Sequence, residues 1–241
     1  MKSLIELFSF VSKILFPNLC VSCSKYLGNH AEVICNACYS NIPIESAFKC
    51  YGCKKRTPTI SGKIRACKCG YKFIVGAPNH YSTSGLNHLI TALKYKGTIK
   101  AAKPLGNLLC SFIKESKLKI ANFIIIPVPL SKTREKERGY NQAELITFEF
   151  LKQITDQTLV YQKDVLKRTR DTLSQAKIQS YESRKNNLLN AFQVINVSLI
   201  KGKYILLIDD VITSGATAIE ASNTLIKAGA RKVIILTTAR A

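Results

Sequence analysis

Eight cysteines arranged as four close pairs constrain this 241-residue chain more than any other feature. Two residues separate the cysteines in each of the first three pairs, and one residue separates those in the fourth. A two-residue spacer turns both thiolates to one side of a tight knuckle, and two knuckles complete a tetrahedral S4 site. The pattern therefore predicts two structural zinc ions in tandem zinc ribbons. The expected ligands are Cys20, Cys23, Cys35, Cys38, Cys50, Cys53, Cys67 and Cys69.

Other interpretations of the cysteines stay open. Gaps of 11 and 13 residues suit a hairpin inside each ribbon, but interleaved ribbons would divide the ligands differently. Disulfide bonds are the second alternative, and they would require an export signal that the N-terminal stretch does not provide. Four sulfur ligands leave no open position for water, which favours a structural zinc. Cys110 stands alone in an apolar segment, and we expect it to be a small buried hydrophobe.

The charge balance is strongly basic. Lys and Arg number 36 against 15 Asp and Glu, a formal net charge of +21. Such a field attracts polyanions, without distinguishing nucleic acid from lipid headgroups or small phosphorylated ligands. No run approaches the roughly 18 apolar residues of a membrane span. Residues 1–17 have the spacing of an amphipathic helix that either docks on the body of the protein or lies on a membrane surface.

Beyond the cysteines the pattern changes to alternating strands and helices. Two apolar runs, 204–208 and 233–237, flank a helical pattern over 216–228, which predicts a βαβ unit and a parallel sheet. We expect an α/β domain over 72–241, behind a small double zinc ribbon over 18–71. The other expected elements are helices over 86–96, 103–117 and 140–154, a strand over 123–126, and loop with a short helix over 163–190.

A candidate ligand-binding motif, 209–217, follows the apolar run 204–208. Asp209 and Asp210 stand at its end, and a hydroxyl-rich turn leads from Thr213 into the predicted helix. Adjacent carboxylates can bind a sugar diol, directly or through Mg²⁺, and a turn at a helix N-terminus can bind a phosphate. Together they fit a ribose 5-phosphate. The sequence contains no P-loop, and no G-x-G-x-x-G follows a strand. The alternative is that the two aspartates have a purely structural role and cap a loop.

These residues resemble the phosphoribosyl pyrophosphate signature of type I phosphoribosyltransferases. With the two zinc ribbons, the chain is similar to the ComF family of bacterial DNA-uptake proteins, over nearly its whole length. Its short segments recur in order: LKYKG at 93–97, PVPL at 127–130, RGYNQ at 138–142 and RTRDTLSQ at 168–175. The resemblance implies a Rossmann-like type I phosphoribosyltransferase domain joined to the ribbons.

The resemblance also implies roles for residues. Asp209 and Asp210 would hold the ribose hydroxyls of phosphoribosyl pyrophosphate and its Mg²⁺, and Arg138 would serve as the catalytic clamp on the pyrophosphate. Arg168 and Arg170 would close over the site as a flap, or lie on a solvated basic surface. Thr213 occupies the place where purine-salvage relatives carry a further acid that acts as a base on the purine. The sequence therefore does not identify a purine as the acceptor. Residues implied to bind the ligand are Asp209, Asp210, Val211, Thr213, Ser214, Gly215, Ala216 and Thr217.

Three functions fit this resemblance. The first is a competence protein that handles incoming single-stranded DNA on the cytoplasmic side, in the cytoplasm or peripheral at the inner membrane, with the DNA-uptake machinery as partner. The second is an active transferase with an unidentified acceptor, and the third is a ligand-responsive DNA-binding regulator. Zinc ribbons often present basic and aromatic side chains to nucleic acid. Candidate DNA contacts are Lys54, Lys55, Arg56, Lys63, Arg65, Lys68, Tyr51 and Tyr71.

Overall fold

Two long strands near the C-terminal end of the chain form the centre of the fold. The computed structural model describes residues 17–28, 32–65, 67–71, 73–156, 158–170 and 190–241. In it, β11 (Tyr204–Ile212) pairs in parallel with β12 (Lys232–Arg240), and α9 (Ala216–Lys227) connects them. The predicted βαβ unit is therefore confirmed.

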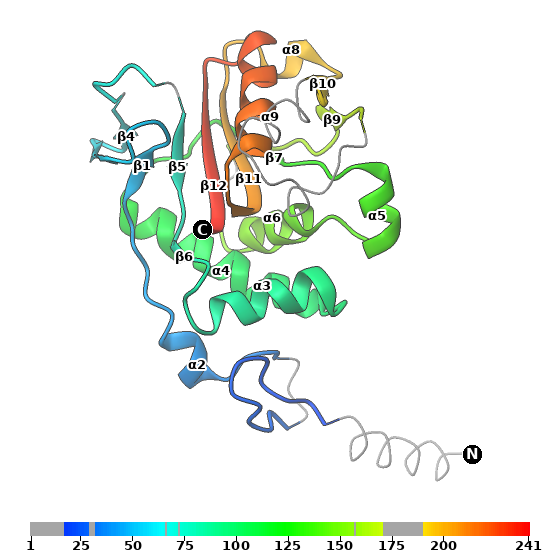
Figure 1. The fold of residues 1–241 in the computed structure, drawn as a ribbon. Coiled ribbons are helices and arrows are strands. Elements are labelled where there is room, and N and C mark those ends of the chain that lie inside the picture. Colours follow the sequence, from blue (N-terminus) through cyan, green and yellow to red (C-terminus); the bar gives the residue numbers. More distant parts are fainter. Residues whose placement is uncertain (1–16, 29–31, 66, 72, 157, 171–189) are drawn as a thin grey trace.

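The sheet extends on both sides of this pair (Figure 1). Its order is β2-β1-β5-β12-β11-β7-β8, with β6 beside the end of β12. All described pairings from β5 to β8 are parallel, whereas β1 is antiparallel to β5 and β2. The predicted α/β class with a parallel sheet is confirmed. The bounds are β1 Phe48–Cys50, β2 Arg56–Thr57, β5 Ile74–Gly76, β6 Asn79–His80, β7 Phe123–Pro127 and β8 Val160–Tyr161.

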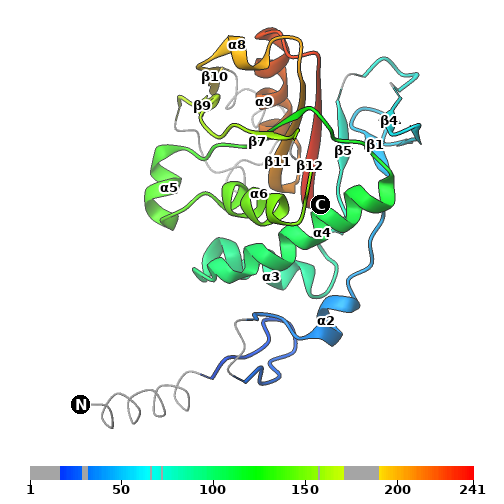
Figure 2. The same cartoon turned by 180° about the vertical axis from the view of Figure 1, so that it is seen from behind.

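Helices cover both faces of the sheet, which explains why its strands are unbroken apolar runs. Leu206 and Ile208 pack toward α3, α4 and α6, whereas Ile205 and Leu207 pack toward α9 (Figures 1 and 2). Side chains alternate between the faces of a strand, so both alternating sets must be hydrophobic here. These helices are close to expectation: α3 spans Leu86–Tyr95, α4 Ala102–Ser116 and α6 Gln142–Lys152.

Three expectations about local structure are wrong: the end of the strand over 204–208, the segment that carries Arg138, and the described part of 163–190, which contains a strand. The strand predicted over 204–208 continues to Ile212, because β12 extends alongside it and pairs Asp209 with Thr237 and Ile212 with Arg240. The aspartates therefore lie inside β11 and not in a loop after it.

The segment that carries Arg138 is the second correction: it lies between the expected strand over 123–126 and the expected helix over 140–154, where we expect a loop, and it forms a helix of its own. α5 (Lys132–Arg138) begins where Ser131 Oγ accepts from the Arg134 N–H, and it ends at Gly139, which has a φ of 76°. In the region expected to be loop and short helix, the described part includes β9 (Leu166–Arg168), which pairs with β10 (Phe192–Val194) beyond it.

The two cysteine clusters are attached to the sheet in different ways. The first lies beside the short helix α2 (Asn36–Ser40), below α3 and α4 in Figure 1, where the Tyr39 hydroxyl donates to the Pro104 carbonyl at 3.4 Å. The second is built on β1, which belongs to the central sheet and ends at Cys50. Strand pairing thus crosses the expected boundary at residue 72, while the division into 1–17, 18–71 and 72–241 stays a prediction.

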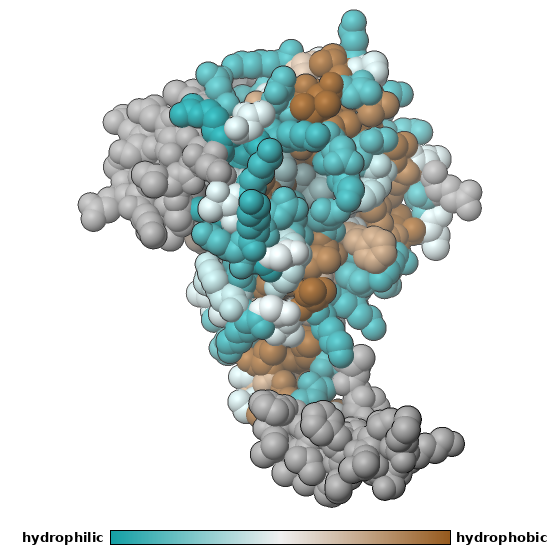
Figure 3. Space-filling view, turned by 90° about the vertical axis from the view of Figure 1, so that its right-hand side faces the viewer, coloured by the Kyte–Doolittle hydropathy of each residue, from teal (hydrophilic) through white to brown (hydrophobic). Residues whose placement is uncertain are grey.

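The remaining expectations concern surface and membrane. Seen from the side on which α5 lies, the surface is largely hydrophilic, with hydrophobic side chains showing between hydrophilic ones (Figure 3). Within the described part of the chain, no helix combines the length and hydrophobicity that crossing a membrane requires. The predicted amphipathic helix over 1–17 lies outside the described residues apart from Pro17.

Candidate functional site

The carboxylate pair lies where β11 approaches its carboxyl end. Asp210 is buried, with its side chain 12% exposed, and it forms a 3.0 Å ion pair with the Lys94 ammonium of α3. The Asp210 backbone is also fixed, since its N–H donates to Asp209 Oδ1 at 2.8 Å and its carbonyl accepts from Thr238. Ligands of open α/β sheets bind outside the carboxyl ends of strands. The fold therefore places both aspartates where a ligand can reach them.

The two aspartates have different electrostatic surroundings. Burial, together with the neighbouring Asp210 carboxylate, raises the pKa of Asp209 to about 7, against the opposing effects of Lys94 and Arg168. Lys94 is the counter-ion of this pair: although burial disfavours its charge, the two aspartates leave its pKa above the usual value. Lys94 belongs to the LKYKG segment, and its place in the sequence alone assigns it no role. The position of Lys94 beside the two aspartates depends on tertiary packing. Its presence in the LKYKG motif is the one sign in the sequence that it belongs to the site.

The turn after β11 is built to approach other groups closely. Gly215 has a φ of 73° and precedes the first residue of α9, Ala216, without a side-chain cap. A Cβ at Gly215 would lie 2.4 Å from the Tyr51 ring, and the Tyr51 hydroxyl donates to the Ser214 carbonyl. Tyr51 lies between Cys50 and Cys53, so the second cysteine cluster contacts this turn directly. The helix N-terminus here can attract an anion.

The segment around Arg138 is held against α3. The Arg138 guanidinium lies 5.5 Å from the centre of the Tyr95 ring and donates to Gln142 Oε1 at 2.9 Å. The Tyr140 hydroxyl donates to the Leu93 carbonyl at 2.6 Å. Arg138 therefore neighbours Tyr95, the residue after the counter-ion of Asp210. Thus two of the short motifs, LKYKG and RGYNQ, meet beside the carboxylate pair.

The two arginines expected in a flap differ in their surroundings. Arg168 ends β9, is 8% exposed, and has its guanidinium 5.6 Å from the centre of the Phe192 ring. It also acts to lower the pKa of Asp209, which places its charge within electrostatic reach of the pair. Arg168 is therefore not part of a solvated basic surface. Arg170 is exposed, and the residues 171–175 of the same motif lie outside the described part.

A cavity of about 330 Å³ adjoins the turn after β11. Thr213 lines one side of it and Tyr51 another. Lys49 and Arg240 contribute positive charge, and both form ion pairs with Glu45, at 3.3 and 2.6 Å. The second cysteine cluster and the carboxyl ends of β11 and β12 thus enclose space beside the predicted phosphate-binding turn.

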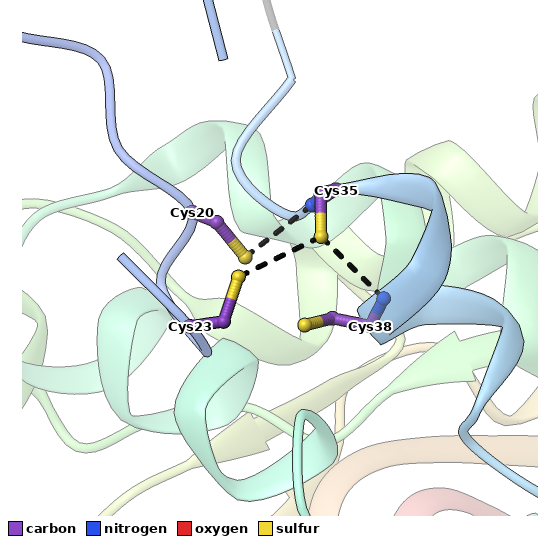
Figure 4. A group of neighbouring side chains, drawn as sticks. All are labelled: Cys20, Cys23, Cys35 and Cys38. Carbon is purple, nitrogen blue, oxygen red and sulfur yellow. Dashed lines mark hydrogen bonds between the residues drawn. The ribbon is translucent and has the colours of Figure 1, made fainter. Parts of the chain in front are cut away.

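The cysteines form two groups of four, divided in tandem. Cys20, Cys23, Cys35 and Cys38 make the first group and Cys50, Cys53, Cys67 and Cys69 the second, with the sulfurs of each group within 4.8 Å of one another. In the first group, Cys23 Sγ and Cys35 Sγ are 3.8 Å apart (Figure 4). In the second, separations of 3.5 and 3.4 Å join Cys50 to Cys69 and Cys53 to Cys67. Tetrahedral zinc with bonds of about 2.3 Å requires about 3.8 Å between sulfurs.

The donor set of each group suits a divalent cation. Burial acts to raise the pKa of the Cys20 thiol, but nearby backbone N–H groups outweigh it and lower that pKa to about 6. The Tyr71 N–H lowers the pKa of Cys69 to about 6. Hydrogen bonds with neighbouring cysteines instead raise the pKa of Cys38 and of Cys67 to about 12, so the fit to a cation is carried by the grouping of the four sulfurs. Among the described residues all nine cysteines are free thiols, so the disulfide alternative is not supported. Both groups fit structural zinc, and Cys110 is buried as expected, with burial raising its pKa to about 12.

The predicted DNA contacts lie on the surface of the second cluster. All six basic candidates, from Lys54 to Lys68, are exposed. Tyr51 is partly buried by its contact with Ser214 and lies 5.8 Å from the ring of Tyr71, between ring centres. Lys54 covers the Tyr51 ring at 3.9 Å. Tyr51 is thus engaged with the turn after β11 and is a poorer platform for stacking than the sequence suggested.

This chain is similar to a known domain family and to bacterial competence and DNA utilization proteins. The Phosphoribosyl transferase domain family matches residues 145–241. Competence protein F of Haemophilus influenzae is 30% identical over 92% of this chain and 90% of its own length. Competence protein ComFC of Streptococcus pneumoniae is 27% identical over 86% and 87%, respectively. DNA utilization protein YhgH of Escherichia coli is 30% identical over 61% of this chain, which spans 64% of that protein.

Loss of the second metal site should damage the fold more than loss of the first, because β1 and β5 belong to the central sheet. We expect Cys53→Ser and Cys23→Ser each to lower the zinc content from two ions to about one per chain. Cys53→Ser should lower the free energy of unfolding by about 2–5 kcal/mol, and Cys23→Ser by less than about 1 kcal/mol. Metal analysis and urea unfolding followed by circular dichroism measure both; equal destabilisation would contradict the expectation.

Replacing Asp209 should stabilise the protein near neutral pH. Since folding raises the pKa of Asp209 from 3.8 to about 7, the stability linked to its proton is present below about pH 4 and lost as the pH rises to 7. We expect Asp209→Asn to gain about 1–4 kcal/mol relative to the unsubstituted chain at pH 7.5, and progressively less toward pH 5.5.

Asp210→Asn is the matched control for this titration. The change is identical one residue along, but it leaves the Lys94 ammonium buried without its counter-ion, so we expect a loss of about 1–3 kcal/mol. Urea unfolding of both variants over this pH range, with zinc present, gives the comparison. A pH-independent difference for Asp209→Asn would refute the raised pKa.

Proposed function

This chain belongs to the ComF family of competence proteins, and on that premise we propose that it binds phosphoribosyl pyrophosphate with Mg²⁺ and handles single-stranded DNA in competence. The observation that carries the proposal is the joining of Asp209 and Asp210 to a glycine-containing turn at a helix N-terminus, with Lys94 paired to Asp210. Family membership supports the role in DNA uptake. The basic excess of the chain supports a polyanionic partner.

The proposed roles follow from the chemistry of each group. The carboxylates of Asp209 and Asp210 accept hydrogen bonds from the two ribose hydroxyls. The turn of Thr213, Ser214 and Gly215, with the first residues of α9, receives the 5-phosphate, because backbone N–H groups and the helix dipole favour an anion there. Val211, Ala216 and Thr217 complete this proposed site.

Positive charge on the other side of the ligand comes from two helices. Lys94 neutralises Asp210 in the free protein and is available to a phosphate once ribose or metal takes that carboxylate. Arg138, at the end of α5, is the proposed clamp on the pyrophosphate. Bound Mg²⁺ would supply further charge neutralisation between the pyrophosphate and the ribose hydroxyls.

Transfer of the phosphoribosyl group to an acceptor is a second candidate function. The observation that favours it is the Asp209 carboxyl, whose pKa of about 7 suits proton transfer near neutral pH. The cavity between Tyr51 and Thr213 offers room for an acceptor beside the proposed ligand. Pyrophosphate release that stays at background with a panel of nitrogen acceptors would leave ligand binding as the function.

Calorimetry tests the ligand site. We expect saturable binding of phosphoribosyl pyrophosphate in the presence of Mg²⁺, and at least about 100-fold weaker binding by the double variant Asp209→Ala/Asp210→Ala, which loses both diol acceptors. Substitution of the exposed Lys152, on α6, serves as the control and should leave the affinity unchanged. No binding by the zinc-loaded protein would refute this part of the proposal.

The salt dependence of DNA binding tests the second part. Contacts with phosphates release counterions, so the logarithm of the association constant should fall linearly with the logarithm of salt concentration. For an oligothymidine of about 15 nucleotides we expect a slope of about −3 or steeper, which corresponds to four or more phosphate contacts at about 0.7 per contact. Fluorescence anisotropy gives the slope, and a slope near zero would exclude DNA handling through phosphates.

A further inference from the structure

A second cavity lies at the opposite end of the central strands from the aspartates. It measures about 510 Å³ and adjoins the amino-terminal ends of β7, β11 and β12. Counting about 3.3 Å per residue, Tyr204 at its edge is about 17 Å along β11 from Asp209. Nothing in the proposed ligand site uses these residues. Those that line the cavity are Ser61, Gly62, Lys63, Ile64, Leu118, Lys119, Ala121, Phe123, Tyr204, Arg231, Lys232 and Ile234.

The hairpin of the second cysteine cluster closes one side of this cavity. Its strands are β3 (Thr59–Ile60) and β4 (Lys63–Ile64), which pair between Cys53 and Cys67. The Lys232 ammonium donates to the Ile64 carbonyl at 2.8 Å, and the Lys119 N–H donates to the Gly62 carbonyl at 2.9 Å. Hydrogen bonds therefore fix the hairpin to β12 and to the connection between α4 and β7.

The cavity is positively charged and carries no compensating acid. Lys63, Lys119, Arg231 and Lys232 line it, and none of the described lining residues is acidic. Within the described part of the chain, none of these four cations forms a salt bridge. Burial lowers the pKa of Lys232, so part of its hydration is already lost without a carboxylate to replace it. An entering anion would gain from all four charges.

Aromatic groups complete the lining. The Arg231 guanidinium lies 5.2 Å from the centre of the Tyr204 ring, and that ring lies 5.4 Å from the ring of Phe123, between centres. Nucleobases stack on aromatic rings and on the planar guanidinium of arginine. A stacking surface next to four cations matches the two chemical parts of a nucleotide, its base and its phosphate. A cavity of about 510 Å³ has room for a single nucleotide, and the bases of a single strand are free to enter it, whereas those of a duplex are paired and stacked.

We propose that this cavity binds a nucleotide of single-stranded DNA, with the phosphate between Lys63, Lys119 and Lys232 and the base against Arg231 and Tyr204. The inference rests on the proposed handling of single-stranded DNA and gives it a location. Because the cavity and the aspartates lie at opposite ends of β11, DNA and phosphoribosyl pyrophosphate can be bound at the same time.

A charge-matched pair of triple variants tests the location. Lys63→Gln, Lys119→Gln and Arg231→Gln remove three cations from the cavity. Lys100→Gln, Lys103→Gln and Lys114→Gln remove three exposed cations from α4 and the turn before it. We expect the cavity variant to bind the oligothymidine at least about 10-fold more weakly, with a salt slope shallower by about 2, and the control to change less than about 3-fold. Zinc content, circular dichroism and phosphoribosyl pyrophosphate affinity, which should stay unchanged, report on folding.

The possible outcomes separate this inference from the proposed function. Equal weakening by both triple variants would mean that DNA contacts a diffuse basic surface, which refutes the cavity while DNA binding stands. No binding by the unsubstituted chain would refute the DNA part of the proposed function itself. Photo-crosslinking with an oligomer that carries bromodeoxyuridine adds a positional readout, since the inference expects the crosslink at Tyr204. Crosslinks confined to other residues would contradict it.

Discussion

The parallel pairing of β11 with β12 is the constraint on which the rest of the structure depends. Both strands are buried on both faces, so helices must cover each side of the sheet, and α9 must return from one strand to the other. The turn that starts α9 therefore lies at the carboxyl ends of the strands. Because β12 pairs with β11 as far as Ile212, the aspartates are held in a regular strand next to that turn. The candidate site is a consequence of this packing.

The second cysteine cluster contacts the sheet at both ends. Tyr51, inside one knuckle, touches the turn at Ser214 and Gly215, and the hairpin between the knuckles accepts a hydrogen bond from Lys232 at the amino-terminal end. Its strand β1 pairs with β5 inside the same sheet. A metal that fixes this cluster would thereby fix the walls of both cavities. The first cluster is attached through the helices instead: Tyr39 contacts α4, and Cys20 packs into the core that α3 and α4 share with the sheet.

Electrostatics explain the arrangement around the aspartates. Two adjacent carboxylates in a buried strand repel each other, and Lys94 lowers that cost by pairing with Asp210. Asp209 has no such close partner among the described residues, and burial keeps its pKa raised. In the free protein, therefore, the Asp210 carboxylate is paired with a cation, whereas the Asp209 carboxyl is not and has a raised pKa. Under the proposed function, a ligand that brings hydroxyl donors or a cation would lower the repulsion between the two carboxylates.

Features that depend on local spacing can be predicted from this sequence alone. Cysteine spacing indicated two four-sulfur sites and apolar runs indicated buried parallel strands, while the ligand site on the Asp209 to Thr217 motif stays a proposal. Apolar periodicity missed α5, because this charged helix buries no residue and its local signal is the Ser131 cap. It also missed the last four residues of β11, because a partner strand decides them. Other contacts arise only when the chain folds. Lys94 then faces Asp210, and Tyr51 covers Gly215. Four cations also meet at the amino-terminal ends of the strands. These contacts join residues distant in the chain, and their partners follow from how sheet and helices pack, which no local spacing records.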